Sequence, residues 1–312
     1  MALPLSIIRP DTSGEPVVWP ITSETSTGFA PAVLHVIPPV AWAGAAAASS
    51  TGSKRKAFFI PTVCAGLAEP QLERLVAPTM TAHKTGDPTT LNRLYGRASG
   101  HKLRKSQQEL VDKVLPQIEV PAEGEITAKR LFGEDRPLHF EIGFGSGEHL
   151  AYRADLLPDH GFIGCEPFIN GVATALAHVR DRHLANVRLW KGDALDVLRR
   201  VPDGALSFIY LLHPDPWPKA RHAKRRMVND GPVDLFASKL KPNGEFRLAT
   251  DDPTYLTWAL MVMQRHGHQF EWLAAKPKDF LEPSGGWIET RYGAKSRREG
   301  RRPYYLRYRR KG

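Results

Sequence analysis

The sequence predicts an α/β fold built on a mostly parallel sheet. From Leu138 onward, short apolar segments typical of strands alternate with segments typical of helices. Each helical segment has the position and length of a crossover connection, and such connections join parallel strands in the right-handed sense. In a sheet of this kind, ligands bind beyond the carboxyl ends of the strands.

The individual elements follow from this pattern. We expect strands at Leu138–Ile142, Gly161–Cys165, Val187–Trp190, Leu206–Leu212 and Glu245–Ala249. We expect helices at Glu148–Leu156, Phe168–Arg182, Ala194–Val201 and about Val233–Leu240. Near the C-terminus, the alternation over Tyr304–Tyr308 predicts a strand that pairs with the sheet edge.

A helix and a basic arm are predicted ahead of the sheet, within residues 80–137. Ser106–Leu115 carries an apolar stripe, with Ser106 as N-cap, Glu109 as its capping-box partner and Pro116 as the end signal. The alternative for the arm is a solvated charge run. The arm residues are Arg93, Arg97, His101, Lys102, Arg104 and Lys105.

Residues 1–79 differ in composition from the rest of the chain. They hold ten prolines, an Ala-Ser stretch at Ala45–Ser50 and no sustained helical or strand period. We expect a disordered extension or a segment upstream of the true start, with Met80 as the candidate first residue. The competing interpretation is an RNA-binding or targeting tail, and Ala57–Val63 could pack locally as a strand.

Composition limits the partners. The 312 residues carry a net charge of +10, all of it within 80–312, which points to an anionic partner such as nucleic acid. The stretch Pro31–Ala48 contains three prolines and is not apolar enough for a membrane-spanning helix. Cys64 and Cys165 show no zinc-site spacing, so we expect no metal and two free thiols in the cytoplasm, with a disulfide as the alternative.

A glycine-rich loop follows the first strand of the sheet. Gly143, Gly145 and Gly147 allow the backbone to pass close beneath a ligand and turn into the next helix. The spacing is not the one that sets a pyrophosphate on a helix N-terminus, so the loop suits a ligand without phosphates. Nicotinamide and flavin binders share such loops, and a plain tight turn is the alternative.

Three acids stand at or near consecutive strand ends. Glu141 precedes the glycine loop, Glu166 follows the second strand and Asp193 follows the third. Glu166 stands where a carboxylate can accept both ribose hydroxyls, and Asp193 where one can meet an adenine edge. Each could instead be a surface acid or a helix cap. Together they indicate an adenosine site, and acids favour a cationic sulfonium ligand over an anionic dinucleotide.

The fourth strand ends in a proline-rich turn. The prolines around Asp215 cannot continue a central strand, so Asp215 is held at its carboxyl end. Trp217 offers a face for stacking a base. The basic run from Lys219 to Arg226 that follows suits phosphates.

In several short sequence motifs, residues 138–310 resemble the bacterial tRNA (guanine-N7)-methyltransferase family, and Leu94–Gln107 resembles its N-terminal arm. The resemblance implies a Rossmann-like S-adenosylmethionine-dependent methyltransferase fold over 138–312, with a mostly parallel seven-stranded sheet and helices on both faces. The motifs are Glu141–Gly147, Phe162–Phe168, Asn170–Val172, Tyr210–Lys219, Arg221-His222, Lys224–Arg226, Ala249–Asp251 and Thr290–Tyr292.

The resemblance also implies residue roles. Asp215 would stand at the reaction centre, and a monomer or homodimer would methylate N7 of guanosine 46 in the variable loop of tRNA. The cofactor S-adenosylmethionine would be bound by Glu141, Gly143, Gly145, Glu166, Asp193 and Asp215. The guanosine or its flanks would be bound by Lys219, Asp251, Thr290, Arg291, Tyr292 and Gly293.

One position departs from the family pattern. The family usually has an acid where this chain has Gly293, and Glu289 or Asp251 could take its place. Two other functions stay open from the sequence. One is an RNA-binding module with an inactive cofactor pocket, and the other is a nicotinamide-dependent oxidoreductase on a similar sheet.

Overall fold

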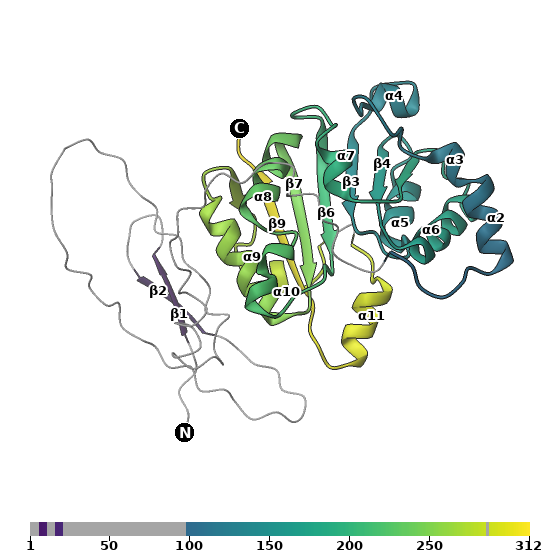
Figure 1. The fold of residues 1–312 in the computed structure, drawn as a ribbon. Helices are drawn as coiled ribbons and strands as arrows, with labels where there is room; N and C mark the ends of the chain where they lie inside the picture. The colour runs from purple at the N-terminus through teal and green to yellow at the C-terminus, as the bar shows by residue number, and fades with distance from the viewer. Residues whose placement is uncertain (1–5, 11–15, 21–97, 285–286) are drawn as a thin grey trace. The chain divides into compact units, whose positions relative to one another are not determined.

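The computed structural model describes residues 6–10, 16–20, 98–284 and 287–312 (Figure 1). The chain divides into two units, Met1–Lys84 and Thr85–Gly312. In the first unit, strand β1 (Ser6–Pro10) pairs antiparallel with β2 (Pro16–Pro20), a pairing that the sequence did not indicate. The other residues of the expected extension, and Arg93 and Arg97 of the basic arm, lie outside the described residues.

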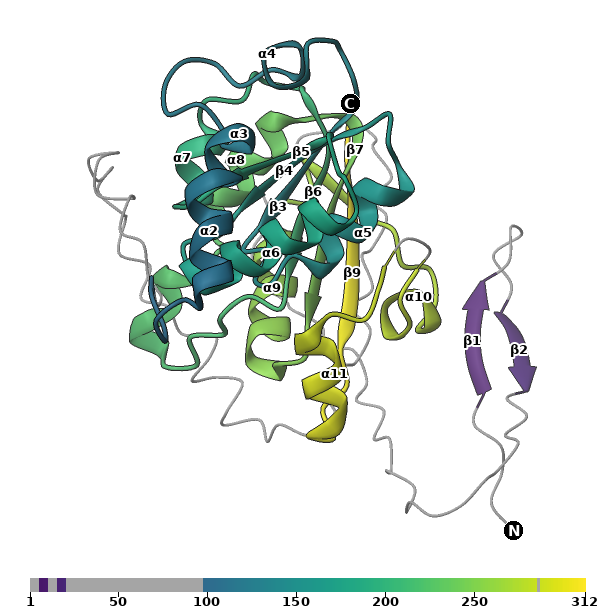
Figure 2. The same ribbon diagram turned by 90° about the vertical axis from the view of Figure 1, so that its right-hand side faces the viewer.

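The second unit is built on one seven-stranded sheet with the order β5-β4-β3-β6-β7-β9-β8. The first five strands of this order are parallel, and β9 runs antiparallel to both of its neighbours (Figure 2). The prediction of a mostly parallel seven-stranded sheet is confirmed. The strands are β3 (Leu138–Ile142), β4 (Gly161–Cys165), β5 (Val187–Trp190), β6 (Leu206–Leu212), β7 (Leu240–Thr250), β8 (Phe270–Trp272) and β9 (Tyr304–Arg310).

The four strands from β3 to β6 have the predicted bounds. Strand β7 begins five residues early, because Leu240 already pairs with Leu206 before the register shifts. The predicted C-terminal strand exists as β9 and pairs with β7, but β8 covers its other side. Strand β8 is therefore the sheet edge, and its three residues are too few to show a period.

Helices cover both faces of the sheet (Figure 2). Apolar residues of α2, α5 and α6 share one buried cluster with β4 and β5. On the other side of the central strands, Phe236 of α8 packs against Phe246 of β7 with ring centroids 5.2 Å apart. The helices are α2 (Lys105–Lys113), α3 (Leu115–Ile118), α4 (Ala128–Phe132), α5 (Glu148–Leu156), α6 (Ile169–Asp181), α7 (Ala194–Leu198), α8 (Asp230–Lys239), α9 (Pro253–Arg265), α10 (Lys278–Leu281) and α11 (Arg291–Arg298), with a 3-10 helix η2 (Ala220–Arg225).

The start of α2 corrects a prediction. Ser106 is not its cap. Arg104 is the N-cap residue, and the side chain of Gln107 accepts its backbone N–H at 3.1 Å. Pro116 does not end α2 either, because α2 already stops at Lys113 and Pro116 lies in the first turn of α3, where a missing N–H is tolerated.

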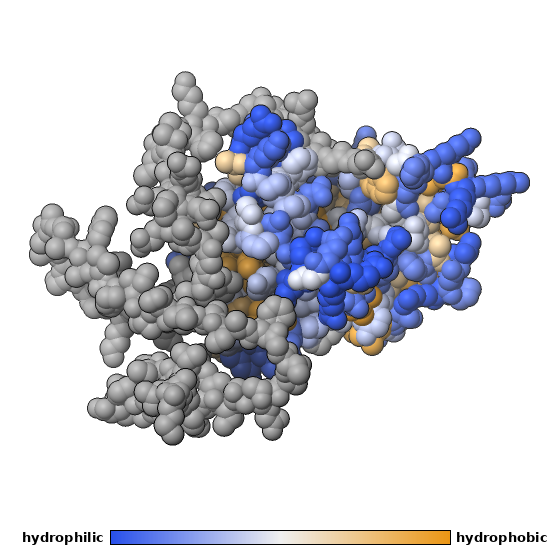
Figure 3. All heavy atoms as spheres, turned by 90° about the horizontal axis from the view of Figure 1, so that it is seen from below, coloured by the Kyte–Doolittle hydropathy of each residue, from blue (hydrophilic) through white to orange (hydrophobic). Residues whose placement is uncertain are grey.

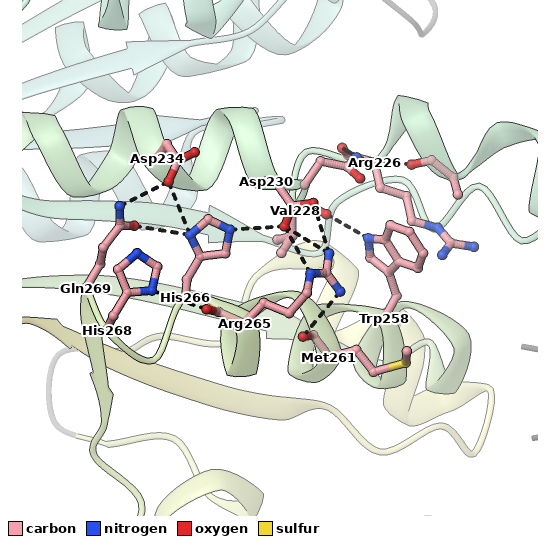
Figure 4. A network of polar contacts seen from close by, with 12 residues as sticks. Arg226, Val228, Asp230, Asp234, Trp258, Met261, Arg265, His266, His268 and Gln269 are labelled. Carbon is pink, nitrogen blue, oxygen red and sulfur yellow. Dashed lines mark hydrogen bonds and ion pairs between the residues drawn. The ribbon is translucent and has the colours of Figure 1, made fainter. Parts of the chain in front are cut away.

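A polar network joins α8 to α9 and continues to the loop after β6 (Figure 4). The His266 ring contacts Asp230 through Nε2 at 3.0 Å, and Arg265 donates to the same carboxylate. Trp258 of α9 donates its indole N–H to the carbonyl of Val228 at 2.7 Å. The Arg226 guanidinium lies 4.8 Å from the centre of the Trp258 ring, so the network reaches the segment that follows β6.

In the part of the chain that the structure describes, no helix combines the length and the apolar character that a membrane span requires. No group of three or more His, Cys, Asp or Glu side chains in this part of the chain is arranged to hold a metal ion.

Candidate active site

A cavity of about 580 Å³ lies at the carboxyl ends of β3, β4 and β6. It is lined by residues from the glycine loop, the segments after β4, β5 and β6, and the start of α11. A smaller cavity of about 400 Å³ shares no lining residue with it. The predicted site residues that line the larger cavity are Gly143, Gly145, Glu166, Asp193, Asp215, Arg291 and Tyr292.

Glycine is required both in the glycine loop and in the helix beside it, for two different physical reasons. Gly143 and Gly145 have φ values of +66° and +58°, a region that residues with a Cβ rarely adopt. In addition, a Cβ on Gly171 of α6 would lie only 2.3 Å from the carbonyl oxygen of Gly145. Glycine at these positions therefore brings the loop and the start of α6 close together beside the cavity.

Glu166 anchors this loop from the end of β4. Its two carboxylate oxygens accept the backbone N–H groups of Gly145 at 2.8 Å and Phe168 at 2.9 Å. Burial raises the pKa of Glu166, the two backbone bonds oppose this, and the charge of Asp215 adds to the rise. The carboxylate faces the cavity and keeps lone pairs for further donors.

Asp193 caps a helix and also lies in the cavity wall. Its side chain accepts the backbone N–H of Leu195 at 2.9 Å as the N-cap of α7, and it also lines the cavity. Burial raises the pKa of Asp193. A helix cap and a ligand contact are compatible, because a carboxylate has two oxygens.

Glu141 lies elsewhere. It is 3% exposed, contacts Nδ1 of His149 at 2.7 Å and is not among the residues that line the cavity. His149 is the second residue of α5, the helix that follows the glycine loop. Without the fold, its sequence position gave no sign of this pairing.

The loop after β6 carries Asp215 in an unusual backbone. His213 and Trp217 have φ values of +51° and +44°, which cost free energy in residues other than glycine. The Arg226 side chain donates to the carbonyls of Pro216 and Trp217, both at 3.0 Å. Asp215 is exposed and lines the cavity between the two strained residues.

The basic run therefore has two parts. Arg226 is 5% exposed and holds the loop, so it is not a phosphate contact. Arg225 lies over the Trp217 ring at 4.9 Å and covers one face of it. The exposed members of the run are Lys219, Arg221 and Lys224.

The start of α11 closes the cavity on another side. Thr290 caps the helix by accepting the Gly293 N–H at 3.2 Å. Arg291 donates to the Ser146 hydroxyl at 3.0 Å, beside the glycine loop. Tyr292 lines the cavity next to Gly145, and burial together with the charges of nearby acids raises its pKa.

Asp251 does not line the cavity. Oδ2 of Asp251 accepts from Ser296 Oγ and Arg301 Nε, both at 2.6 Å, while Oδ1 lies 3.3 Å from His213 Nδ1. Burial works against ionisation, but these hydrogen bonds lower the pKa of Asp251 to about 2. Thr290, Gly293 and Lys219 are also absent from the lining.

The lining residues to which the sequence analysis gave no role of their own include His213 and Asn170. His213 lines the cavity. Asn170 lines it too, and its amide bonds the backbone of Gly100 at 3.0 Å and His101 at 2.8 Å, which ties the arm to α6. The signal for Asn170 was its place beside Gly171 in a motif, but its partners are about 70 residues away along the chain.

The sheet order, the glycine loop and the acids at the strand ends define a Rossmann-like methyltransferase that uses S-adenosylmethionine. Residues 135–306 match the family described as "Putative methyltransferase". The chain belongs to the tRNA (guanine-N7)-methyltransferase family. This membership replaces the alternative of a nicotinamide-dependent oxidoreductase.

Curated relatives of high sequence identity show that the chain belongs to this family. The tRNA (guanine-N(7)-)-methyltransferase of Sphingopyxis alaskensis is 70% identical over 237 residues, and that of Novosphingobium aromaticivorans is 68% identical over 238 residues. The one from Zymomonas mobilis is 55% identical over 231 residues. Each match covers 74% of this chain and 100% of the relative.

Proposed function

We propose that this chain transfers a methyl group from S-adenosylmethionine to N7 of guanosine 46 in the variable loop of tRNA. The observation that carries the proposal is the placement of Asp215 and Trp217 in one cavity with the glycine loop and Glu166. This arrangement brings a carboxylate and an aromatic ring to the place where the cofactor would bind. Family membership supports methyl transfer to N7 of guanosine in tRNA. The choice of position 46 is the more specific part of the proposal.

The residues present fit S-adenosylmethionine. Glu166 and Asp193 offer carboxylate oxygens for ribose hydroxyls and an adenine amino group, and Gly143 and Gly145 add no side chains of their own to the cavity. When bound, the cofactor supplies a methyl group on a positively charged sulfur. The acids of the cavity favour that charge. Glu141 does not line the cavity, so it would affect the cofactor only indirectly, through the glycine loop that it precedes.

Asp215 would act by electrostatics and not by taking a proton. Guanine N7 carries a free lone pair, so its attack needs no general base. The purine gains positive charge as the methyl group arrives. A carboxylate about 4 Å from a unit charge, at an effective dielectric constant near 20, contributes about 4 kcal/mol. Only the part that grows toward the transition state raises the rate, so a rigidly held Asp215 serves this role well.

The face beyond the strand ends would bind the tRNA. Figure 3 views the molecule from below Figure 1, where α11 lies, and hydrophilic side chains gather there. Exposed cations lie on α11 and in the run after Asp215, two segments that also supply residues to the cavity lining, and they can contact phosphates. They are Lys219, Arg221, Lys224, Lys295, Arg297 and Arg298.

Methyl transfer to tRNA tests the proposal directly. The full chain is incubated with bulk tRNA and labelled S-adenosylmethionine, and the nucleosides are then separated. Label in 7-methylguanosine is expected. Label in another nucleoside, or tRNA binding without transfer, would refute the reaction and favour an inactive RNA-binding module. A transcript with adenosine at position 46 should lose the label, and an unchanged signal would refute the position.

A further inference from the structure

His213 is a polar residue of the cavity to which no function has been assigned above. It directly follows β6, and its backbone N–H donates to the carbonyl of Ala249 at 2.8 Å, so its position is fixed by the sheet. Its side chain is 7% exposed and lines the same cavity as Asp215, two residues further on.

Asp251 fixes the orientation and the tautomer of the His213 ring. Asp251 is ionised and itself held by Ser296 and Arg301, so it can only accept hydrogen bonds. Nδ1 of His213, 3.3 Å away, must therefore carry the proton that faces Asp251. Burial lowers the pKa of His213, although Asp251 opposes this, so the ring is neutral and Nε2 keeps its lone pair.

The Nε2 atom is available to a ligand. Among the residues that the structure describes, it has no hydrogen-bond partner. His213 is also among the residues that line the cavity. Its Nε2 lies 3.8 Å from the point that a Cβ on Gly293 would occupy, next to Tyr292, which lines the cavity.

We propose that His213 is a specificity-determining residue whose Nε2 accepts a hydrogen bond from N1–H of the target guanine, with Asp251 as the residue that positions it. The inference rests on the proposed function. Guanine has a proton on N1, whereas adenine has a lone pair there. An acceptor aimed at this atom therefore binds guanine and repels adenine, and a site built around such a bond discriminates strongly.

This role accounts for Gly293. An acid at this position would place a second acceptor beside His213, because a Cβ there would lie within ordinary contact distance of Nε2. With the neutral imidazole in place, the site has its acceptor without a carboxylate from α11. Asp251 then acts through His213, which fits the engagement of both its oxygens within the protein.

The test compares His213→Asn with the wild-type chain on the same tRNA. Asparagine tolerates a positive φ better than most residues, so it suits the backbone at this position. We expect kcat/KM for tRNA to fall about tenfold or more, while the Kd for S-adenosylmethionine stays within about twofold. His268→Asn, a change at an exposed histidine outside the cavity, is the matched control and should leave kcat/KM unchanged.

Two further measurements separate recognition from a structural effect. Adding Gly293→Glu to His213→Asn supplies an acceptor at the same place and should restore part of kcat/KM. A tRNA whose target guanosine is methylated on N1 should be a poor substrate for the wild-type chain, which tests the contact without any variant.

Each result decides a separate point. Wild-type kcat/KM in His213→Asn, a loss that Gly293→Glu does not reverse, or full activity on the N1-methylated tRNA would each overturn the inference. A wild-type chain that transfers no methyl group to unmodified tRNA would instead overturn the proposed function.

Discussion

Replacing Glu166 with alanine removes the acceptor of two backbone hydrogen bonds and of the expected ribose contact. The bonds to Gly145 and Phe168 are 2.8 and 2.9 Å long and involve a charged acceptor. Hydrogen bonds to charged groups contribute about 1.5–3 kcal/mol each, but water from the cavity can replace part of this. We expect Glu166→Ala to lower the free energy of unfolding by about 2 kcal/mol.

The effect on the cofactor should be separate from this loss. Without Glu166, the ribose hydroxyls lose their acceptor and the glycine loop loses its anchor, so binding of S-adenosylmethionine should weaken by about 1–3 kcal/mol. This corresponds to a Kd roughly 5- to 150-fold higher. Glu166→Gln keeps one acceptor oxygen but turns an amide N–H₂ toward a backbone donor, so it should fall between the wild type and alanine.

Calorimetry of S-adenosylmethionine binding measures the main effect, and chemical unfolding measures the stability change. Glu123→Ala, which removes an exposed acid that does not line the cavity, is the control for lost charge. Filter binding should show unchanged tRNA affinity in all three variants. A Glu166→Ala protein with wild-type cofactor affinity would refute the reasoning, whatever its stability.

Asp215→Ala should abolish measurable transfer and keep the wild-type melting temperature, because its side chain is exposed; near-normal turnover of the purified variant would contradict its role. Asp251→Asn should lower the free energy of unfolding at pH 7 by about 1–2 kcal/mol, after allowance for solvent screening. The folded-state pKa of Asp251, about 2, lies below the ordinary aspartate value of 3.8. The stability difference should therefore be full above pH 3.8 and shrink as the pH falls toward 2 in urea unfolding curves. A pH-independent difference would exclude the charge as its source. The ten basic residues of Arg291–Lys311 should make tRNA affinity fall steeply with salt; a flat dependence in filter binding would rule this out. A protein that begins at Met80 should match the full chain in turnover and melting temperature, and loss of most activity would show that residues 1–79 belong to the enzyme.

The sequence predicted best those features that depend on residues close together along the chain. Strands β3 to β6 have the predicted bounds because each is a short apolar run bounded by turn residues. Glu141, Glu166 and Asp193 were grouped in advance because the carboxyl ends of parallel strands meet at one edge of the sheet. Glu166 and Asp193 do line one cavity together with Asp215, but Glu141 does not.

The sequence predicted least well those features that depend on hydrogen bonds between residues far apart along the chain. The bonds of Asp251 to Ser296 and Arg301 span 45 and 50 residues, so no local pattern could show that its oxygens are engaged. The cap of α2 was misassigned because Ser106 fits the local rule, whereas the side chain of Gln107 satisfies the N–H of Arg104. A pattern of residue types cannot decide between two such local solutions.

A distant part of the fold supports the loop that carries Asp215. Positive φ values at His213 and Trp217 cost about 1–3 kcal/mol each, so the loop needs support from outside itself. Arg226 provides it through the carbonyls of Pro216 and Trp217.

Arg226 is in turn held against the Trp258 ring, whose N–H is fixed by the carbonyl of Val228 (Figure 4). A charge that is already held in place when the purine becomes positive requires no reorganisation at that moment. A buried arginine in a run of cations thus contributes to the rate that we propose for Asp215 without contacting the RNA. Its neighbours Arg221 and Lys224 stay exposed for the phosphates.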